Sequence, residues 1–199
     1  MNTSDEEAWI NCELNDLWLF DKLILSRKLG YKCGPAGVPV PKPGNYIVRP
    51  VTNVIGMGKG ASFKYIENDT KDLPAGSFWC QIFEGRHLSV DYHYGSPILT
   101  VEGFRNLGDP LWKFSKWQKC AEQLFMPIEL SVLRKFEYVN IEYIGKRVIE
   151  VHLRGNPDFA HGNTVAIPVW NDDDVDQPVA DELRYIDAPD YMRKGFLID

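Results

Sequence analysis

The stretch that decides the fold is residues 140–157, NIEYIGKRVIEVHLRGNP. Apolar and polar residues alternate on both sides of a short Gly-Lys break, which predicts two antiparallel strands joined by a turn. Because successive side chains of a strand point to opposite faces, Glu150, His152 and Arg154 share one face. The apolar side chains between them point to the other face. The sequence therefore predicts a hairpin with one apolar face and one charged face.

The length of the turn decides which charged residues of the two strands meet. With a three-residue turn at 145–147, Glu142 lies opposite Glu150 and Asn140 lies opposite His152. A two-residue turn would place Glu142 opposite an apolar residue and would mix the two faces. The alternation therefore favours the three-residue turn.

Two opposed glutamates would have Cβ atoms about 5 Å apart and would repel each other, so a positive group should lie between them. A magnesium ion is one candidate, because it prefers carboxylate oxygens, and Arg154 could then hold a phosphate. The alternative is a solvated face on which the glutamates pair with Arg154 or a nearby lysine.

The composition is that of a folded globular protein of about one domain. Apolar residues make up 44% of the 199 residues, and the net charge of -6 argues against nucleic acid and anionic membranes as partners. The four cysteines are far apart, which favours free thiols and a cytoplasmic location. No apolar run approaches the roughly 18 residues needed to span a membrane.

The pattern along the chain favours an α+β fold in which helices cover antiparallel sheet. We expect one helix over residues 15–30, ended by Gly30, and helical segments over 109–135 that Pro127 separates. Before the hairpin, the expected strands are residues 45–53, 62–67, 76–83 and 87–94. The chain after Pro157 is expected to be irregular.

The segment 56–61, GMGKGA, is a second candidate site. Gly56, Gly58 and Gly60 alternate with larger residues, so that backbone N–H groups around Lys59 could wrap a phosphate. The segment is not a P-loop of the form G-x-x-x-x-G-K-[ST]. Asn53 stands where the first glycine belongs, and Gly60 stands where Ser or Thr should follow the lysine. On spacing alone, a flexible hairpin tip is as good an interpretation.

Four motifs, taken in order, resemble those of the ATP-grasp superfamily. FDKLILSRKLGYKCGPAGVPVP, residues 20–41, resembles the segment that carries the family's first nucleotide lysine. YIVRPVTNVIGMGKGA, residues 46–61, resembles the strand and glycine-rich flap over the phosphates, and WCQIFEGRHLSVDY, residues 79–92, resembles the hinge that meets adenine. The opening hairpin is similar to the strands that hold magnesium and contact the transferred phosphate.

This resemblance implies binding of ATP and Mg²⁺ and assigns a role to individual residues. The implied nucleotide-binding residues are Lys22, Arg49, Gly56, Gly58, Lys59, Gly60, Gln81, Ile82, Phe83 and Glu84. The implied metal ligands are Glu142, Glu150 and His152, and Arg154 is the implied catalytic residue. Arg49 stands in place of a lysine and His152 in place of an asparagine, and an imidazole suits softer metal ions better than magnesium.

The resemblance also implies a single ATP-grasp-like domain, residues 1–199, with two small lobes of antiparallel sheet. The N-terminal lobe with the flap would span about 15–80, the metal and phosphate lobe about 81–160, and an irregular C-terminal segment 161–199. The implied activity is an ADP-forming ligase that joins a small-molecule carboxylate to an amine. We expect the family's N-terminal substrate domain to be absent here and a partner chain or a homo-oligomer to supply it. The alternative is a catalytically inactive nucleotide-binding or structural module within a larger assembly.

Overall fold

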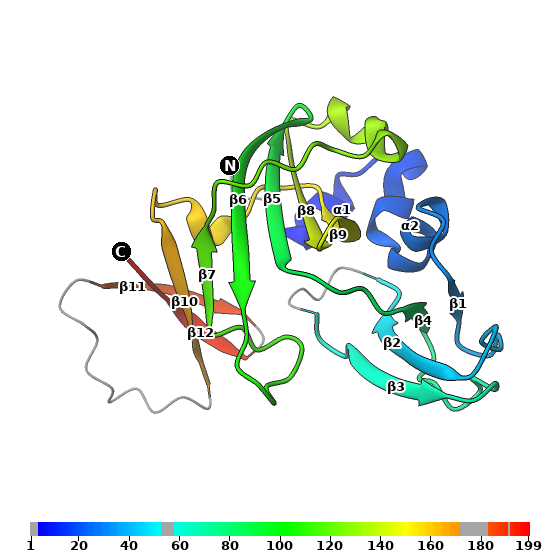
Figure 1. Ribbon diagram of the computed structural model, residues 1–199. Helices are drawn as coiled ribbons and strands as arrows, with labels where there is room; N and C mark the ends of the chain where they lie inside the picture. Colours follow the sequence, from blue (N-terminus) through cyan, green and yellow to red (C-terminus); the bar gives the residue numbers. More distant parts are fainter. Residues whose placement is uncertain (1–3, 53–57, 172–182, 191) are drawn as a thin grey trace.

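The computed structural model describes residues 4–52, 58–171, 183–190 and 192–199. It is an α+β structure of two antiparallel sheets with helices packed against them, as expected (Figure 1). None of the helices in these residues is long and apolar enough to cross a membrane.

The smaller sheet has the strand order β1-β4-β2-β3. Its strands are β1 (Cys33–Pro35), β2 (Gly44–Pro50), β3 (Ser62–Ile66) and β4 (Ser77–Gln81). The expected hairpin across the glycine-rich segment is confirmed, because β2 and β3 pair antiparallel with Gly44 opposite Ile66. One face of this sheet is closed by a small core that includes Tyr46, Val48 and Trp79.

The larger sheet has the order β11-β12-β10-β7-β6-β5-β8-β9. Its strands are β5 (His87–His93), β6 (Ser96–Phe104), β7 (Lys116–Lys119), β8 (Tyr138–Ile144), β9 (Arg147–His152), β10 (Val165–Trp170), β11 (Arg184–Asp190) and β12 (Arg193–Ile198). The main core lies on one face of β5, β8 and β9, where the buried side chains include Val90, Tyr92, Ile141 and Val151. The polar side chains of the same strands therefore point to the opposite face.

The C-terminal segment 161–199 was expected to be irregular, and this expectation is wrong for the described residues. β10, β11 and β12 extend the larger sheet (Figure 1), and β10 alternates between partly and fully buried positions. Pro168 is compatible with a strand at this position, although proline donates no ladder hydrogen bond. β7 pairs only with Val165 and Ala166, so Pro168 lies beyond that ladder.

The helix expected over 15–30 is two helices, η1 (Leu14–Phe20) and α2 (Lys22–Lys28), preceded by α1 (Asp5–Ile10). The break is at Asp21, whose backbone is extended and whose carboxylate accepts a 2.8 Å hydrogen bond from the Ile24 N–H. A side chain of this type is a preferred N-cap, which explains why α2 begins where it does. Gly30 follows α2 with a φ of 74°, as expected of a residue that ends a helix.

Helical structure over 109–135 is confirmed only after Pro127, where η2 (Ile128–Lys135) begins. The segment before Pro127 contains β7 and irregular chain. Its aromatic residues pack on the sheet, and the ring centroids of Phe114 and Trp117 lie 4.4 Å apart. η1, α2 and η2 supply buried leucines to the main core, so they cover the face opposite the polar one. A last short helix, η3 (Pro157–Phe159), follows the hairpin.

The hairpin of β8 and β9 has the predicted register but a different turn. Asn140 lies opposite His152 and Glu142 opposite Glu150, as expected, whereas the turn contains two residues because Ile144 pairs with Arg147. The register shifts between Glu142 and Tyr143, which is a β-bulge at Ile149. The bulge accommodates the extra residue that the prediction had assigned to the turn.

Candidate active site

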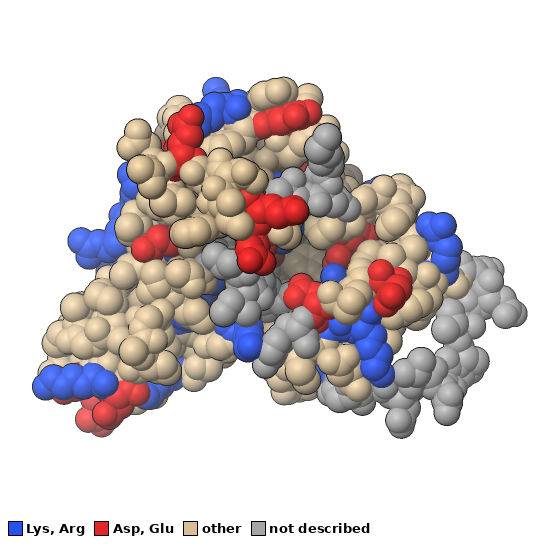
Figure 2. Space-filling model, turned by 180° about the vertical axis from the view of Figure 1, so that it is seen from behind, with Lys and Arg blue, Asp and Glu red and all other residues tan. Residues whose placement is uncertain are grey.

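A cavity of about 1000 Å³ lies between the two sheets, and the polar face of β5, β8 and β9 forms one wall of it. Figure 2 shows a hollow on this side of the molecule, with acidic side chains gathered around it. Among the predicted site residues, those that line the cavity are Lys22, Arg49, Gly58, Ile82, Phe83, Glu84, Glu142, Glu150, His152 and Arg154. Segments far apart in sequence therefore meet at one place.

Lys22 joins the first helical region to the hairpin. It is the first residue of α2, and its backbone N–H donates a 2.8 Å hydrogen bond to the Val51 carbonyl beside β2. Its ammonium lies 3.6 Å from the Glu150 carboxylate, and both side chains are almost fully buried. The pair thus places a cation and an anion inside the cavity wall, where water screens them little.

Arg49 makes a second connection between the sheets. It is a buried residue of β2, and its Nη1 donates a 3.0 Å hydrogen bond to the carbonyl of Ile149, the bulge residue of β9. Its guanidinium carbon lies 5.1 Å from the centre of the Phe78 ring. Its Nε is buried and has no hydrogen-bond partner in the described structure. A buried donor without a partner is costly, so this atom is suited to an additional acceptor.

The flap and hinge residues are placed only in part as predicted. Gly58 lines the cavity with a φ of 63°, whereas Lys59 and Gly60 are not among the described lining residues, and Gly56 lies outside the described residues. Of the hinge, Ile82, Phe83 and Glu84 line the cavity. Gln81 does not, because it pairs with Lys32 through its side chain and backbone, both at 2.9 Å.

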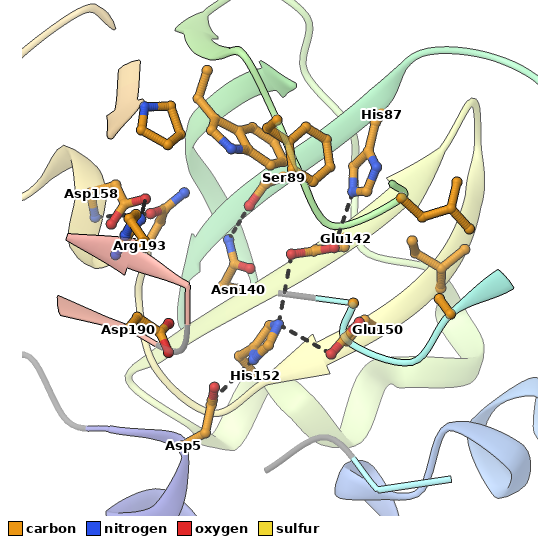
Figure 3. A pocket seen from close by; sticks show the side chains of 18 of the residues that line it. Asp5, His87, Ser89, Asn140, Glu142, Glu150, His152, Asp158, Asp190 and Arg193 are labelled. Carbon is orange, nitrogen blue, oxygen red and sulfur yellow. Dashed lines mark hydrogen bonds and ion pairs between the residues drawn. The ribbon is translucent and has the colours of Figure 1, made fainter. Parts of the chain in front are cut away.

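Glu142 lies between two histidines (Figure 3). Its Oε2 is 3.0 Å from His87 Nε2, and its Oε1 is 3.8 Å from His152 Nε2. Burial alone would raise the pKa of Glu142, but the hydrogen bonds and charges of the two imidazoles outweigh burial and hold the pKa well below its usual range. The rings of Phe114 and Trp117 pack edge-on against His87 and fix its orientation.

His152 supplies the positive group that the opposed glutamates require. Its Nε2 lies 3.8 Å from Glu142 and 3.8 Å from Glu150, and its Nδ1 lies 3.0 Å from Asp5 (Figure 3). Burial would lower the pKa of His152, but the charge and hydrogen bond of Asp5, with the hydrogen bond of Glu142, raise the pKa to about 9. The ring is therefore charged at neutral pH.

Among the predicted metal ligands, the two carboxylates suit a magnesium ion better than the imidazole of His152 does. Glu142 and Glu150 offer the oxygen ligands that magnesium prefers, whereas a charged imidazole must lose its proton before it can bind a metal. The described residues contain no group of three or more His, Cys, Asp or Glu side chains arranged as a metal site. The metal-ligand role of His152 thus stays a prediction, and it carries the cost of deprotonation.

Asp5 is a site residue that sequence reasoning missed. Its carboxylate accepts hydrogen bonds from Arg154 Nε at 3.0 Å and from Arg154 Nη2 at 2.8 Å. On sequence alone, the acidic and polar segment of residues 1–9, MNTSDEEAW, indicates a frayed chain end. The signal that could have found α1 is the Ser4-x-x-Glu7 pattern, which forms a capping box in the structure.

A network beneath the charged residues positions the loop that carries Arg154. Asn140 donates 2.7 Å hydrogen bonds to Ser89 Oγ and Asp91 Oδ1, and Asp91 accepts the backbone N–H of Asn156 at 3.0 Å. Burial raises the pKa of Asp91, against the opposing effect of these hydrogen bonds. The chain just beyond β9 is thereby tied to β5.

The C-terminal strands form a further wall that the sequence did not predict. Arg193 of β12 donates a 2.6 Å hydrogen bond to Asp158, and its guanidinium carbon lies 5.2 Å from the centre of the Phe196 ring. Pro168 and Trp170 of β10 line the same region. The cavity therefore continues past the hairpin, with apolar surface beside an ion pair whose side chains are 10% and 14% exposed.

No family model matches this sequence, and no curated protein matches it. A search of solved structures returns ATP-grasp proteins, the superfamily that the four motifs resemble. One, from Archaeoglobus fulgidus and provisionally classed in that superfamily, is 17% identical, with 91% of this chain and 64% of that chain covered and a TM-score of 0.49.

Two ligases are also similar at lower scores. The L-amino acid ligase from Bacillus licheniformis is 15% identical, with 69% of this chain and 41% of that chain covered and a TM-score of 0.42. D-alanine–D-alanine ligase from Bacillus anthracis is 14% identical, with 70% and 58% covered and a TM-score of 0.39. The chain thus spans less than two thirds of the length of each of these three structures, and similarity at this level concerns the fold alone.

Proposed function

We propose that this protein is an ATP-dependent ligase that phosphorylates a carboxylate and lets an amine displace the phosphate. The observation that supports the proposal best is the convergence of Lys22, Arg49, Glu142, Glu150 and Arg154 on one cavity. These residues come from segments that the resemblance had assigned to nucleotide, metal and phosphate separately. Buried cations and carboxylates gathered in a cleft are typical of a functional site.

The cations would neutralise the phosphates of ATP. Lys22 and Arg49 lie on the side of the smaller sheet, and the buried Nε of Arg49 offers a donor without a present partner in the described structure. Ile82 and Phe83 would contact the adenine, and Glu84 would contact the ribose. A bound nucleotide would therefore lie between the two sheets, with its phosphates toward the hairpin.

Glu142 and Glu150 would hold the magnesium ion. When bound, the ion would offset the negative charge of the phosphates during transfer. Because His152 now lies between the two carboxylates, loading requires that the imidazolium move or lose its proton. His87 keeps one oxygen of Glu142 oriented through its 3.0 Å contact.

In the first step, a carboxylate oxygen of the substrate would attack the terminal phosphorus of ATP, and the bond from that phosphorus to ADP would break. In the second step, the amine nitrogen would attack the acyl carbon, inorganic phosphate would leave with the electron pair of its bond, and the nitrogen would lose a proton. The protein contributes positioning and charge neutralisation, with Lys22, Arg49 and Arg154 around the transferring group.

The second candidate is a nucleotide-binding module without turnover. It is favoured by one observation: the edge of Arg154 that would bind the phosphoryl group is already paired with Asp5. The two candidates share the nucleotide site and differ in whether ADP is released when substrates are added. A partner chain or a second copy could supply the acceptor site, which size-exclusion chromatography with light scattering would detect.

Calorimetry of ATP binding with Mg²⁺, followed by an assay of ADP release with a pool of carboxylates and amines, tests the proposal. A Glu142→Gln/Glu150→Gln variant should lose Mg²⁺-dependent ATP binding. Its matched control is Glu67→Gln/Glu129→Gln, which removes two exposed carboxylates. Substrate-dependent ADP release supports the ligase, and binding without release supports the module. A folded wild-type protein that binds no ATP would rule out both.

A further inference from the structure

The first helix places a carboxylate inside the cavity. Ser4, Asp5 and Glu6 line the cavity, and the Asp5 side chain is 9% exposed. The carboxylate contacts Arg154 Nε and Nη2 at 3.0 and 2.8 Å and His152 Nδ1 at 3.0 Å. Asp5 therefore occupies a cationic site built by β9 and the loop after it.

The guanidinium nitrogens of Arg154 already donate hydrogen bonds in this arrangement. Nη1 donates to the Gly155 carbonyl at 3.1 Å, so the edge formed by Nε and Nη2 is the one directed at Asp5. This edge is the one with which a guanidinium binds a carboxylate or a phosphate through two parallel hydrogen bonds. Asp5 and a substrate oxyanion cannot occupy it together.

We propose that Arg154 and His152 form an oxyanion site for the carboxylate or phosphoryl group of the substrate, and that Asp5 of α1 occupies this site until the substrate displaces it. The identity of the oxyanion rests on the proposed function, whereas the competition rests on the contacts of Asp5. The chain thus carries its own competitor, and α1 must shift for the site to fill.

The structure of α1 is consistent with a segment that can be displaced. The helix has six residues, and its capping box joins Ser4 to Glu7 within the segment itself. Its Ala8 is buried, but Trp9 and Ile10 are largely exposed, at 46% and 65%. A helix this short has little stability of its own, so its position depends on contacts such as those of Asp5.

An alternative role for Asp5 makes the opposite prediction. If Asp5 only positioned Arg154 for an oxyanion that binds elsewhere on the guanidinium, loss of the carboxylate would weaken oxyanion binding. If Asp5 competes, the same change would strengthen it. A site that is open in about 1 to 10% of molecules binds a ligand about 100- to 10-fold more weakly than a fully open site.

The test is titration with inorganic tripolyphosphate and, separately, with glutarate, followed through the ¹⁵N signal of Arg154 Nε in full-length protein. Asp5→Asn should bind one of these anions about 10- to 100-fold more tightly than wild type. The anion that gains identifies the group that the site takes. Glu6→Gln removes an exposed carboxylate from the same helix and should change the affinity less than twofold. Unchanged or weaker binding of both anions by Asp5→Asn would overturn the proposal.

A second variant covers the case in which Asp5→Asn fails to fold. Ser4→Ala/Glu7→Ala removes the capping box without touching Arg154 and should also tighten anion binding, whereas a positioning role predicts no gain. The result is separable from the ligase proposal. If wild-type protein binds no ATP but the variants still bind an anion more tightly, only the ligase proposal is refuted. If wild-type protein binds ATP but no variant binds an anion more tightly, only the inference about Asp5 is refuted.

Discussion

Replacement of Lys22 by methionine should destabilise the fold strongly, because it leaves the buried Glu150 carboxylate without the ammonium that pairs with it. The Lys22 ammonium lies 3.6 Å from Glu150, and the two side chains are 7% and 6% exposed. At this distance and an effective dielectric constant of about 20, the Coulomb attraction is about 5 kcal/mol. Removal of one partner of a buried pair typically costs about 3 to 5 kcal/mol.

The lower end of that range is expected, because His152 Nε2 lies 3.8 Å from Glu150 and still compensates part of its charge. A loss of about 3 kcal/mol corresponds to a fall in Tm of about 6 to 12 °C for a chain of this size. Lys42→Met, which removes an exposed ammonium, should change the stability by less than about 0.5 kcal/mol.

The assay is guanidinium denaturation of a double-mutant cycle formed by Lys22→Met, Glu150→Gln and the combined variant, followed by circular dichroism. The free energy of unfolding of the combined variant should be about 2 kcal/mol higher than the sum of the two single changes predicts. The reason is that the combined variant removes both charges of the pair, so neither is left buried without its partner. A cost below about 1 kcal/mol for Lys22→Met, as for a surface pair, would show that Glu150 is solvated and would refute the reasoning.

Three further changes test other parts of the site. Arg49→Met should cost about 1.5 to 3 kcal/mol in chemical denaturation, because it removes a charged hydrogen bond to the bulge carbonyl; a cost near zero would contradict that bond. Gly85→Ala should lower Tm clearly, since a Cβ at this φ of 129° would lie 2.7 Å from Gly145 Cα; a Tm within 1 °C of wild type, a margin of about 0.3 kcal/mol, would contradict this contact. Burial favours the neutral form of Asp5, but the cations beside it outweigh burial and lower its pKa from 3.8 to about 2. The stability that Asp5 contributes is therefore fully present above about pH 4 and is lost as the pH falls through 2. Denaturation from pH 2 to 6 should show the difference between wild type and Asp5→Asn shrinking at low pH, and a constant difference would contradict the shift.

The hairpin shows how far alternation alone can predict a site. The prediction that Glu142 and Glu150 oppose each other is confirmed, because burial of one face fixes the register. The turn was predicted wrongly, because the alternation does not distinguish a third turn residue from a bulge at Ile149. The difference matters for the site, since the bulge leaves the carbonyl that Arg49 binds.

Asp5 and the C-terminal strands could not be predicted in the same way. Asp5 contacts Arg154 across 149 residues of sequence, and no local pattern specifies such a contact. The capping box predicts that α1 exists but does not say where the helix lies. No strand was predicted for β10, although residues Ala166 to Trp170 pair with β12.

The arrangement around His152 joins the fold to the site. The hairpin brings two carboxylates together, and burial of like charges would be prohibitive without compensation. The structure compensates them with the imidazolium of His152, with His87 on Glu142 and with Lys22 on Glu150. Asp5 in turn balances His152 and Arg154. Removal of any one of these groups leaves a partner with an unpaired charge that is fully or partly buried. An apolar face would therefore be simpler and more stable. A chain that keeps this network on the wall of a cavity departs from the packing that stability alone favours, as functional sites commonly do.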